Sequence, residues 1–390
     1  MGRQTPVGGT PAGSSRCVRL DPLTLPVRFM ANDARADQQL RLVELDRERL
    51  ARDIPDLDLI DHDLPGVERL EALALAAEEA ALEVSGVTKS GGASASAGIG
   101  GMVLVTSDGF SGSYLSSRHS LSTTAIAGEG TRMERDYDFS SALHAADLAD
   151  APSIGRSAGE RAVRRLNPRK VPTGRVPIVF DSRVAPSLIG HLVAAINGAM
   201  VARRTSFLAD KLGERLLADG ICIIDDPLRP RGLRSQPFDA EGVAGRPIAL
   251  VENGVLKSFV LDSATGRELG MATTGHAQRG VSSAPSPGPT NLHLAAGQRT
   301  PRELIGDIAE GFFVTDLIGM GVNLVTGDYS RGAAGFWIEN GELTFPVSEV
   351  TIAGHLLELY RGLEPANDLA FRYGINAPTV RLEGLTVAGR

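Results

Sequence analysis

Apolar residues recur at helical spacing in one stretch that follows a Pro65-Gly66 break. Residues three and four positions apart lie on the same face of a helix, so this pattern predicts a helix over residues 67–84. Its apolar positions are Val67, Leu70, Leu73, Ala74, Ala77, Ala81 and Val84. Two more stretches, 184–200 and 301 to about 315, are also predicted to be helical.

Short, glycine-punctuated segments with alternating or β-branched residues predict strands in the rest of the chain. Such segments lie between Ser90 and Ala127, and the apolar run RVPIVF at 175–180 predicts a further strand. The dipeptides Asn253-Gly254 and Asn340-Gly341 each stand between alternating apolar residues. Hairpin turns of type I′ need positive φ at both central positions, which Asn and Gly tolerate, so two β-hairpins are predicted there.

Together these elements predict an α+β fold, in which an N-terminal α/β-type domain is followed by a β-rich C-terminal domain with a few helices. The Pro-containing stretch LNPRKVPT at 166–173 predicts a boundary between domains at 48–172 and 173–390. Residues 1–47 are rich in Gly, Pro, Ser and Arg and show no sustained periodicity. We expect them to be disordered, or to be a misassigned start.

The formal net charge of -7 argues against nucleic acid as a partner, because binding a phosphate backbone needs an excess of cations. One basic run follows Glu160 at the end of a helix-like stretch. We expect it to be a solvated helix end, where cations complement the helix dipole. Its members are Arg161, Arg164, Arg165, Arg169 and Lys170.

Cysteine usage and hydropathy indicate a cytoplasmic protein. Only Cys17 and Cys222 are present, so neither a disulfide framework nor a Cys-rich zinc module is available. No apolar run reaches the roughly 18 residues that span a bilayer. The first residues also lack the apolar segment of a secretion signal. We therefore expect no membrane partner.

Histidine spacing does not supply a local zinc site. A zinc peptidase needs two imidazoles on one helical face and a carboxylate that activates water. The closest two of the seven histidines, His276 and His293, are too far apart to share a turn of helix. His191 lies alone on a predicted helix and is interpreted as a core or interface residue. A long-range three-histidine site stays open.

Two serines are weak candidates for a nucleophile. Residues 155–159 match the G-x-S-x-G pattern around Ser157, but that motif requires a strand before the serine and only a helix is predicted after it. We interpret the match as a helix N-terminus. Ser330, in GDYSRG, lacks the glycine spacing altogether.

From about Arg49 to Arg390, the chain resembles the TldD/PmbA family, once named modulators of DNA gyrase, and within it the PmbA (TldE) branch. Seven ordered blocks carry the resemblance. They are RLARDIPDLDL (49–59), SSRHSLS (116–122), MERDYDF (133–139), GHLVAAINGAMVARRTSFLADKLGERL (190–216), PFDAEGV (237–243), TTGHA (273–277) and GDYSRGAAGFWIENGELTFPVSEVTIAG (327–354).

The resemblance implies a cytoplasmic pair in which a TldD-type subunit binds zinc through a His-Glu-x-x-x-His helix and a later Cys, and cleaves unfolded or extended peptides. Its two His positions fall on Ile189 and Ala194 of this chain, and its Glu position falls on Gly190. The C-terminal region here contains no Cys. The resemblance therefore implies no metal and no catalytic residue in this chain, with zinc in the partner.

The function implied by the resemblance is that of a non-catalytic subunit that shapes the substrate chamber. The GDYSRG segment is expected to be a loop that lines the chamber through Asp328, Tyr329, Ser330 and Arg331, with His191 and His276 as further candidates. Family members start with a longer α/β region, so the N-terminal domain is expected to be truncated. Alternatives are an independent serine hydrolase and a homo-oligomeric peptide-binding protein without a peptidase partner, and the chain alone could form a homodimer.

Overall fold

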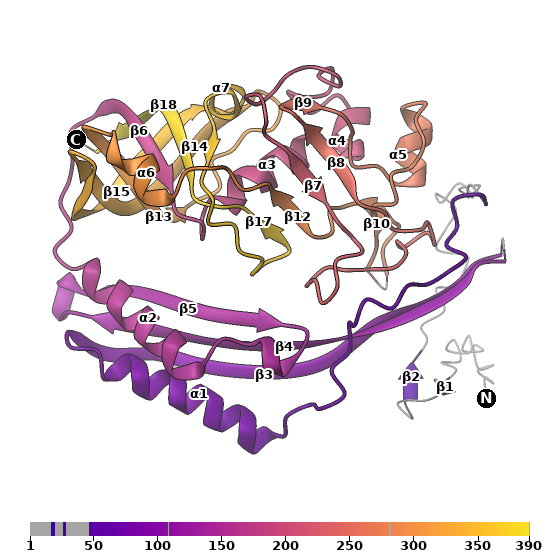
Figure 1. Cartoon of the computed structure of the whole chain (residues 1–390), viewed down its shortest axis with the longest axis horizontal. Coiled ribbons are helices and arrows are strands. Elements are labelled where there is room, and N and C mark those ends of the chain that lie inside the picture. Colours follow the sequence, from indigo (N-terminus) through magenta and orange to yellow (C-terminus); the bar gives the residue numbers. More distant parts are fainter. Residues whose placement is uncertain (1–16, 20–25, 29–46, 108, 281, 390) are drawn as a thin grey trace, which may run out of the picture.

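The computed structural model describes residues 17–19, 26–28, 47–107, 109–280 and 282–389 (Figure 1). The expectation of a disordered or misassigned start at 1–47 lies largely outside these residues. The helices are α1 (Val67–Leu82), α2 (Ala151–Arg164), α3 (Pro186–Ala195), α4 (Gly198–Ala202), α5 (Ser263–Glu268), α6 (Pro301–Gly306) and α7 (Leu356–Arg361). None of the helices in the described ranges has the length and apolar character needed to cross a membrane.

Strands dominate the C-terminal half. The first five are β1 (Cys17–Arg19), β2 (Pro26–Arg28), β3 (Val87–Val105), β4 (Ser111–Ala127) and β5 (Glu134–Ala142). The next seven are β6 (Gly174–Phe180), β7 (Ile223–Asp225), β8 (Ile248–Glu252), β9 (Val255–Leu256), β10 (Ala277–Gln278), β11 (Ser286–Pro287) and β12 (Leu292–Leu294). The last six are β13 (Glu310–Ile318), β14 (Asp328–Glu339), β15 (Glu342–His355), β16 (Glu364–Pro365), β17 (Ile375–Asn376) and β18 (Val380–Ala388). The predicted mixed α+β fold is thus confirmed, whereas the boundary at 172/173 stays a prediction.

The N-terminal part is an antiparallel sheet in the order β3-β4-β5, with α1 and α2 on one face (Figure 1). Leu121 of β4 packs with Ala77 of α1 and Ile154 of α2. Since successive side chains alternate between faces of a sheet, and Leu121 pairs with Ser140, the side chains of Phe139 and Ser141 on β5 point away from these helices. They face the C-terminal part of the molecule.

Small residues allow α1 and α2 to pack closely. A Cβ added at Gly155 would collide with the carbonyl oxygen of Ala77, and one at Gly159 would lie 2.7 Å from Val84 Cγ2. The G-x-S-x-G match therefore lies inside α2, after its cap at Asp150, and its glycines serve helix packing. The structure rules out a nucleophile elbow at Ser157. The helix N-terminus expected at 155–159 is also wrong, because α2 already begins at Ala151.

The C-terminal part contains two larger sheets around a shared core. One sheet has the order β15-β14-β13-β6-β18-β16, and a further β15–β18 pairing closes five of its strands into a ring. The other has the order β17-β12-β7-β8-β9. Buried side chains of α3, including Leu188 and Leu192, pack in one cluster with Phe180 of β6 and Leu292 of β12. The helix α3 is thereby fixed between the two sheets.

Several local predictions can be compared with the structure. The helix over 67–84 and both Asn-Gly hairpins are confirmed, with positive φ at Asn253 and Asn340. The helix over 184–200 is interrupted, because the Asn197 side chain accepts a hydrogen bond from Ala199 N and starts α4 as a separate helix. The helix expected to reach about 315 ends at Gly306, since the apolar residues that follow form β13 between β6 and β14.

Replacing Gly155 by valine is expected to destabilise the fold by at least about 2 kcal/mol, because the new side chain overpacks the α1–α2 contact. The matched control is Arg156→Val, which places the same β-branched residue at the exposed neighbouring position. Urea unfolding of both variants measures the difference. Equal stability of the two would contradict the packing role of Gly155.

Candidate functional site

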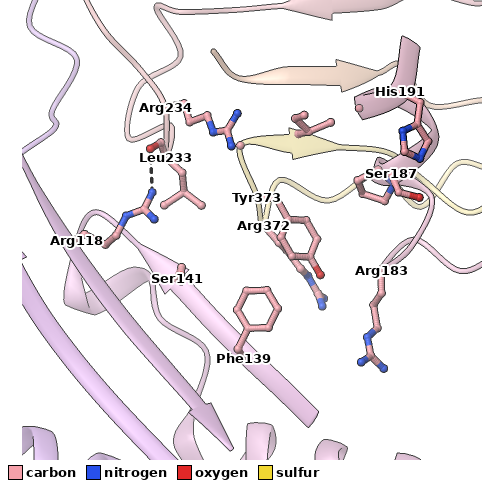
Figure 2. A pocket seen from close by; sticks show the side chains of 14 residues that line it. Arg118, Phe139, Ser141, Arg183, Ser187, His191, Leu233, Arg234, Arg372 and Tyr373 are labelled. Carbon is pink, nitrogen blue, oxygen red and sulfur yellow. Dashed lines mark hydrogen bonds between the residues drawn. The ribbon is translucent and has the colours of Figure 1, made fainter. Parts of the chain in front are cut away.

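A cleft of about 540 Å³ lies between the N-terminal sheet and the C-terminal part of the chain (Figure 2). The strands β4 and β5 form one side, and the start of α3 with two loops forms the other. Its lining residues are Arg118, Phe139, Ser141, Arg183, Pro186, Ser187, Gly190, His191, Leu233, Arg234, Arg372, Tyr373, Gly374 and Ile375. They come from distant parts of the sequence, so the cleft exists only in the folded chain.

A buried carboxylate holds the two sides of the cleft together. Asp136 of β5 is 5% exposed and lies 2.8 Å from Arg183 Nη2 and 3.4 Å from Arg165 Nη1. Arg165 also lies 3.3 Å from Asp316 of β13. Because Arg183 follows β6 directly, this cluster ties the N-terminal sheet to the closed C-terminal sheet.

The basic run was expected to be a solvated helix end, and the structure confirms this in part, since Arg161 and Arg164 lie in the last turn of α2 and Arg164, Arg169 and Lys170 are exposed. Arg165 is mostly buried within the Asp136 cluster. The guanidinium of Arg164 lies 4.8 Å from the ring centre of Phe336, and that of Arg169 lies 4.6 Å from the ring centre of Phe345. Arg164, Arg165 and Arg169 therefore also contact the strands β14, β13 and β15 of the C-terminal part.

The free edge of β5 borders the cleft, since β5 is the outer strand of its sheet. Its own aspartates occupy part of that edge: Tyr137 N donates to Asp136 Oδ1, and Phe139 N donates to Asp138 Oδ1. The carbonyl oxygen of Tyr137 accepts a hydrogen bond from Arg183. This protects the edge from pairing with another strand up to Phe139. Beyond Phe139, the edge continues to Ser141 inside the cleft.

Every charged side chain in the cleft lining is an arginine. They are Arg118, Arg183, Arg234 and Arg372, and the lining contains no aspartate or glutamate. Arg183 is paired with Asp136, whereas Arg118 donates to the carbonyl oxygen of Leu233 at 3.1 Å (Figure 2). The cleft therefore carries a local positive charge within an acidic chain.

His191 is the sequence-predicted candidate that the structure places in the cleft. Burial, together with the positive charge of Arg331, lowers the pKa of His191 to about 4. Its Nε2 atom is buried and has no hydrogen-bond partner among the described residues, and its ring centre lies 6.1 Å from that of Tyr329. The structure thus brings together His191, Tyr329 and Arg331, with a neutral imidazole at pH 7.

The other candidates lie elsewhere. The GDYSRG segment, expected to be a loop, enters the strand β14, because Asp328 and Ser330 pair with β15 across the ladder. Alternation along this strand leaves Asp328 and Ser330 exposed while Tyr329 is buried. His276 is buried away from the cleft lining, where its Nδ1 lies 2.9 Å from Thr274 Oγ1.

The family resemblance implied that metal ligands are missing at three positions. The side chains at these positions contain no donor atoms. Ile189 is fully buried in the core, Gly190 lines the cleft, and Ala194 is partly buried on the same helix. Within the ranges that the structure describes, no group of three or more His, Cys, Asp or Glu side chains could hold a metal ion. The residues present do not fit a zinc ion, so we derive no chemistry through one.

Sequence reasoning missed the arginines of the cleft. Arg118 lies on β4, and Arg234 and Arg372 lie on loops of the C-terminal part. No shared spacing or motif connects them in the sequence. Only the strand alternation around Arg118, which places it on the face opposite Leu121, could have indicated one of them.

Replacing Asp136 by asparagine is expected to destabilise the chain by about 3 kcal/mol, because it leaves Arg165 and Arg183 partly buried without their shared carboxylate. The control is Glu342→Gln, at an exposed carboxylate. Chemical denaturation measures both. If Asp136→Asn lowers the free energy of unfolding no more than the control does, the proposed linkage of the N-terminal sheet to the C-terminal part is contradicted.

Lowering the pH from 7 to 5 is expected to cost about 2 kcal/mol of stability through His191 alone. The unfolded imidazole, with an ordinary pKa of 6.5, binds a proton in this range, whereas the folded one, with a pKa of about 4, stays neutral. Stability is therefore lost as the pH falls. Urea unfolding at both pH values should show this loss in His62→Gln, a control at an exposed histidine, and not in His191→Gln. The same pH dependence in both variants would disprove it.

Comparison with known proteins matches two family models to most of the chain. The PmbA/TldA metallopeptidase central domain matches residues 60–166, and the C-terminal domain of the same family matches residues 173–389. The metalloprotease PmbA of Escherichia coli O157:H7 is 39% identical over 347 residues, which cover 88% of this chain and 75% of that protein.

Solved structures agree with these matches. A candidate modulator of DNA gyrase from Bacteroides thetaiotaomicron has a TM-score of 0.81 at 28% identity, covering 93% of this chain and 80% of that one. The TldE protein of Thermococcus kodakarensis has a TM-score of 0.78 at 24% identity, covering 87% and 78%, and this likeness concerns the fold alone. With the family models and the PmbA relative, the chain belongs to the PmbA/TldD metallopeptidase family.

Proposed function

We propose that this chain is the non-catalytic, zinc-less subunit of a cytoplasmic metallopeptidase of the TldD/TldE type. A TldD-type subunit would supply the zinc and the catalytic residues. This chain would form part of the substrate chamber and restrict access to unfolded or extended peptides. Membership of the family is established by the comparisons, and the division of labour between two subunits is our inference.

The observation that carries the proposal is the chemistry of α3. Ile189, Gly190 and Ala194 stand where the resemblance expects two histidines and a glutamate, and no side chain at these positions can bind a metal or accept a proton. His191, one position from Gly190, is a single imidazole whose neighbours are Tyr329 and Arg331. An arginine and a tyrosine do not complete a zinc site.

The cleft beside α3 supports a role in handling peptides. It is bordered by the free edge of β5, and an extended peptide can pair with a strand edge through main-chain hydrogen bonds whatever its sequence. Because Asp136 and Asp138 occupy the amides of Tyr137 and Phe139, only the last part of this edge is open to a peptide. The remaining edge suits a short extended segment.

The alternative of an independent serine hydrolase has little support. Ser157 lies within α2, whose glycines pack against α1. Ser330 is exposed on β14, and its hydroxyl has no hydrogen bond to a histidine or a carboxylate among the residues described. A nucleophilic serine needs such a base.

Purified alone, the chain is expected to contain far less than one zinc ion per molecule and to cleave no peptide. Adding a TldD-type subunit should produce cleavage of an unfolded peptide, because the catalytic metal enters with the partner. Elemental analysis and a quenched-fluorescence peptide assay measure the two outcomes. Stoichiometric zinc in the isolated chain, or cleavage by it, would refute the proposal.

Two controls separate the alternatives in the same assay. Ser157→Ala and Ser330→Ala should leave the cleavage by the mixed subunits unchanged, whereas a hydrolase that used either serine would lose activity. A TldD-type subunit without its His-Glu-x-x-x-His ligands should give no cleavage in the presence of this chain. If the chain never associates with a TldD-type subunit, a homo-oligomeric binding protein is favoured instead.

A further inference from the structure

We propose that the cleft between β5 and α3 binds a carboxylate of an extended peptide through Arg234 and Arg372, with Arg118 on the β4 side of the cleft. This inference rests on the proposed peptide-handling function and assigns it a substrate class. The carboxylate could be the C-terminal group of the peptide or an aspartate or glutamate side chain. Figure 2 shows the three arginines around the cleft.

The charge of these arginines is not neutralised inside the molecule. Arg118, Arg234 and Arg372 form no ion pair with any carboxylate among the described residues, in contrast to Arg183, which binds Asp136. The nearby aspartates of β5 are also occupied, since Asp138 lies 3.1 Å from Arg161 Nη1. An incoming carboxylate would therefore meet cations without a competing anion in the lining of the cleft.

Two buried asparagines fix the backbone that carries the arginines. Asn291 Oδ1 accepts a hydrogen bond from Arg234 N at 2.9 Å. Asn376 Oδ1 accepts hydrogen bonds from the backbone amides of Arg372 and Tyr373, both at 2.9 Å. Both asparagines are at most 2% exposed. Since the loops are already ordered by these contacts, little conformational entropy would be lost when an anion binds.

A glycine brings the two loops together. A Cβ added at Gly374 would collide with the guanidinium group of Arg234, so glycine at this position lets the Arg234 side chain lie against the loop that carries Arg372. The backbone of Gly374 does not have positive φ, so close approach is the reason for the glycine. Arg234 and Arg372 are thereby held on neighbouring loops at one side of the cleft.

Aromatic rings and a strand edge next to the arginines favour a peptide. The rings of Phe139 and Tyr373 pack against each other with their centres 5.4 Å apart, and their outer surfaces in the cleft can contact the apolar side chains of a bound segment. Ser141 belongs to the part of β5 that continues beyond the occupied amide of Phe139. A volume of about 540 Å³ is within the range of sites for small ligands, so it suits a short segment of peptide.

Nucleic acid fits this surface less well. Binding of a single strand requires a basic groove that follows the backbone over several nucleotides. Here three cations without an ion pair among the described residues line one cleft of about 540 Å³, and the chain has a net charge of -7. A few cations within one small cleft suit a carboxylate better than a row of phosphates.

The test is fluorescence anisotropy with the full chain and labelled ten-residue unfolded peptides at low salt. One peptide has a free C-terminus and no acidic side chain, a second is amidated and contains glutamate, and a third is amidated without glutamate. We expect binding of the first, the second or both, and at least about 10-fold weaker binding of the third. The pattern identifies which carboxylate is bound.

Four variants locate the site. Arg234→Gln and Arg372→Gln should each weaken binding of the carboxylate peptides about 10-fold. Gly374→Ala retains every charge but displaces the Arg234 side chain, so it should weaken binding too. The control, Arg302→Gln, removes an arginine of α6 whose side chain is 90% exposed, and should bind as the wild type does. Thermal unfolding of each variant verifies that it is folded.

Equal binding of all three peptides, or wild-type affinity in folded Arg234→Gln and Arg372→Gln, would overturn the inference. Tight binding of a single-stranded oligonucleotide with no binding of the carboxylate peptides would overturn it as well. The assay needs neither zinc nor a partner. Zinc in the isolated chain would thus refute the proposed function alone. If a zinc-free chain activates its partner but binds none of the peptides, only this inference is refuted.

Discussion

The contact on which the site depends is the pairing of Asp136 with Arg165 and Arg183. A carboxylate this deeply buried is stable only when cations and hydrogen bonds replace its water, and here one cation follows α2 while the other follows β6. The pair therefore fixes the three-stranded sheet against the closed C-terminal sheet. The cleft, with β5 on one side and α3 on the other, exists because of this position.

The helix α3 connects the fold with the proposed loss of catalysis. The side chains of α3 that face the core are large and apolar, and those that face the cleft are small or neutral, as at Gly190 and His191. The cleft presents arginines from β4 and two C-terminal loops. We infer that a scaffold associated with zinc peptidases holds peptides here through hydrogen bonds and charge.

Sequence patterns correctly predicted those elements whose conformation depends on residues close together in the chain. The periodicity of α1 and the positive φ required at Asn253 and Asn340 led to correct assignments. The break between α3 and α4 was missed because it depends on one side chain, Asn197, that caps a new helix. The Asp136 cluster and the cleft could not be predicted, since they join segments far apart in the chain. Even Arg165, taken for a solvated helix end, has partners on β5 and β13.

The central claim is that the zinc of the active pair belongs to the partner subunit while this chain supplies only a binding surface. Native mass spectrometry of the reconstituted pair, followed by dissociation of the two subunits in the gas phase, tests it most directly. The account predicts one zinc ion per pair, which stays with the TldD-type subunit, and a metal-free mass for this chain. Zinc that remains with this chain after dissociation would contradict it.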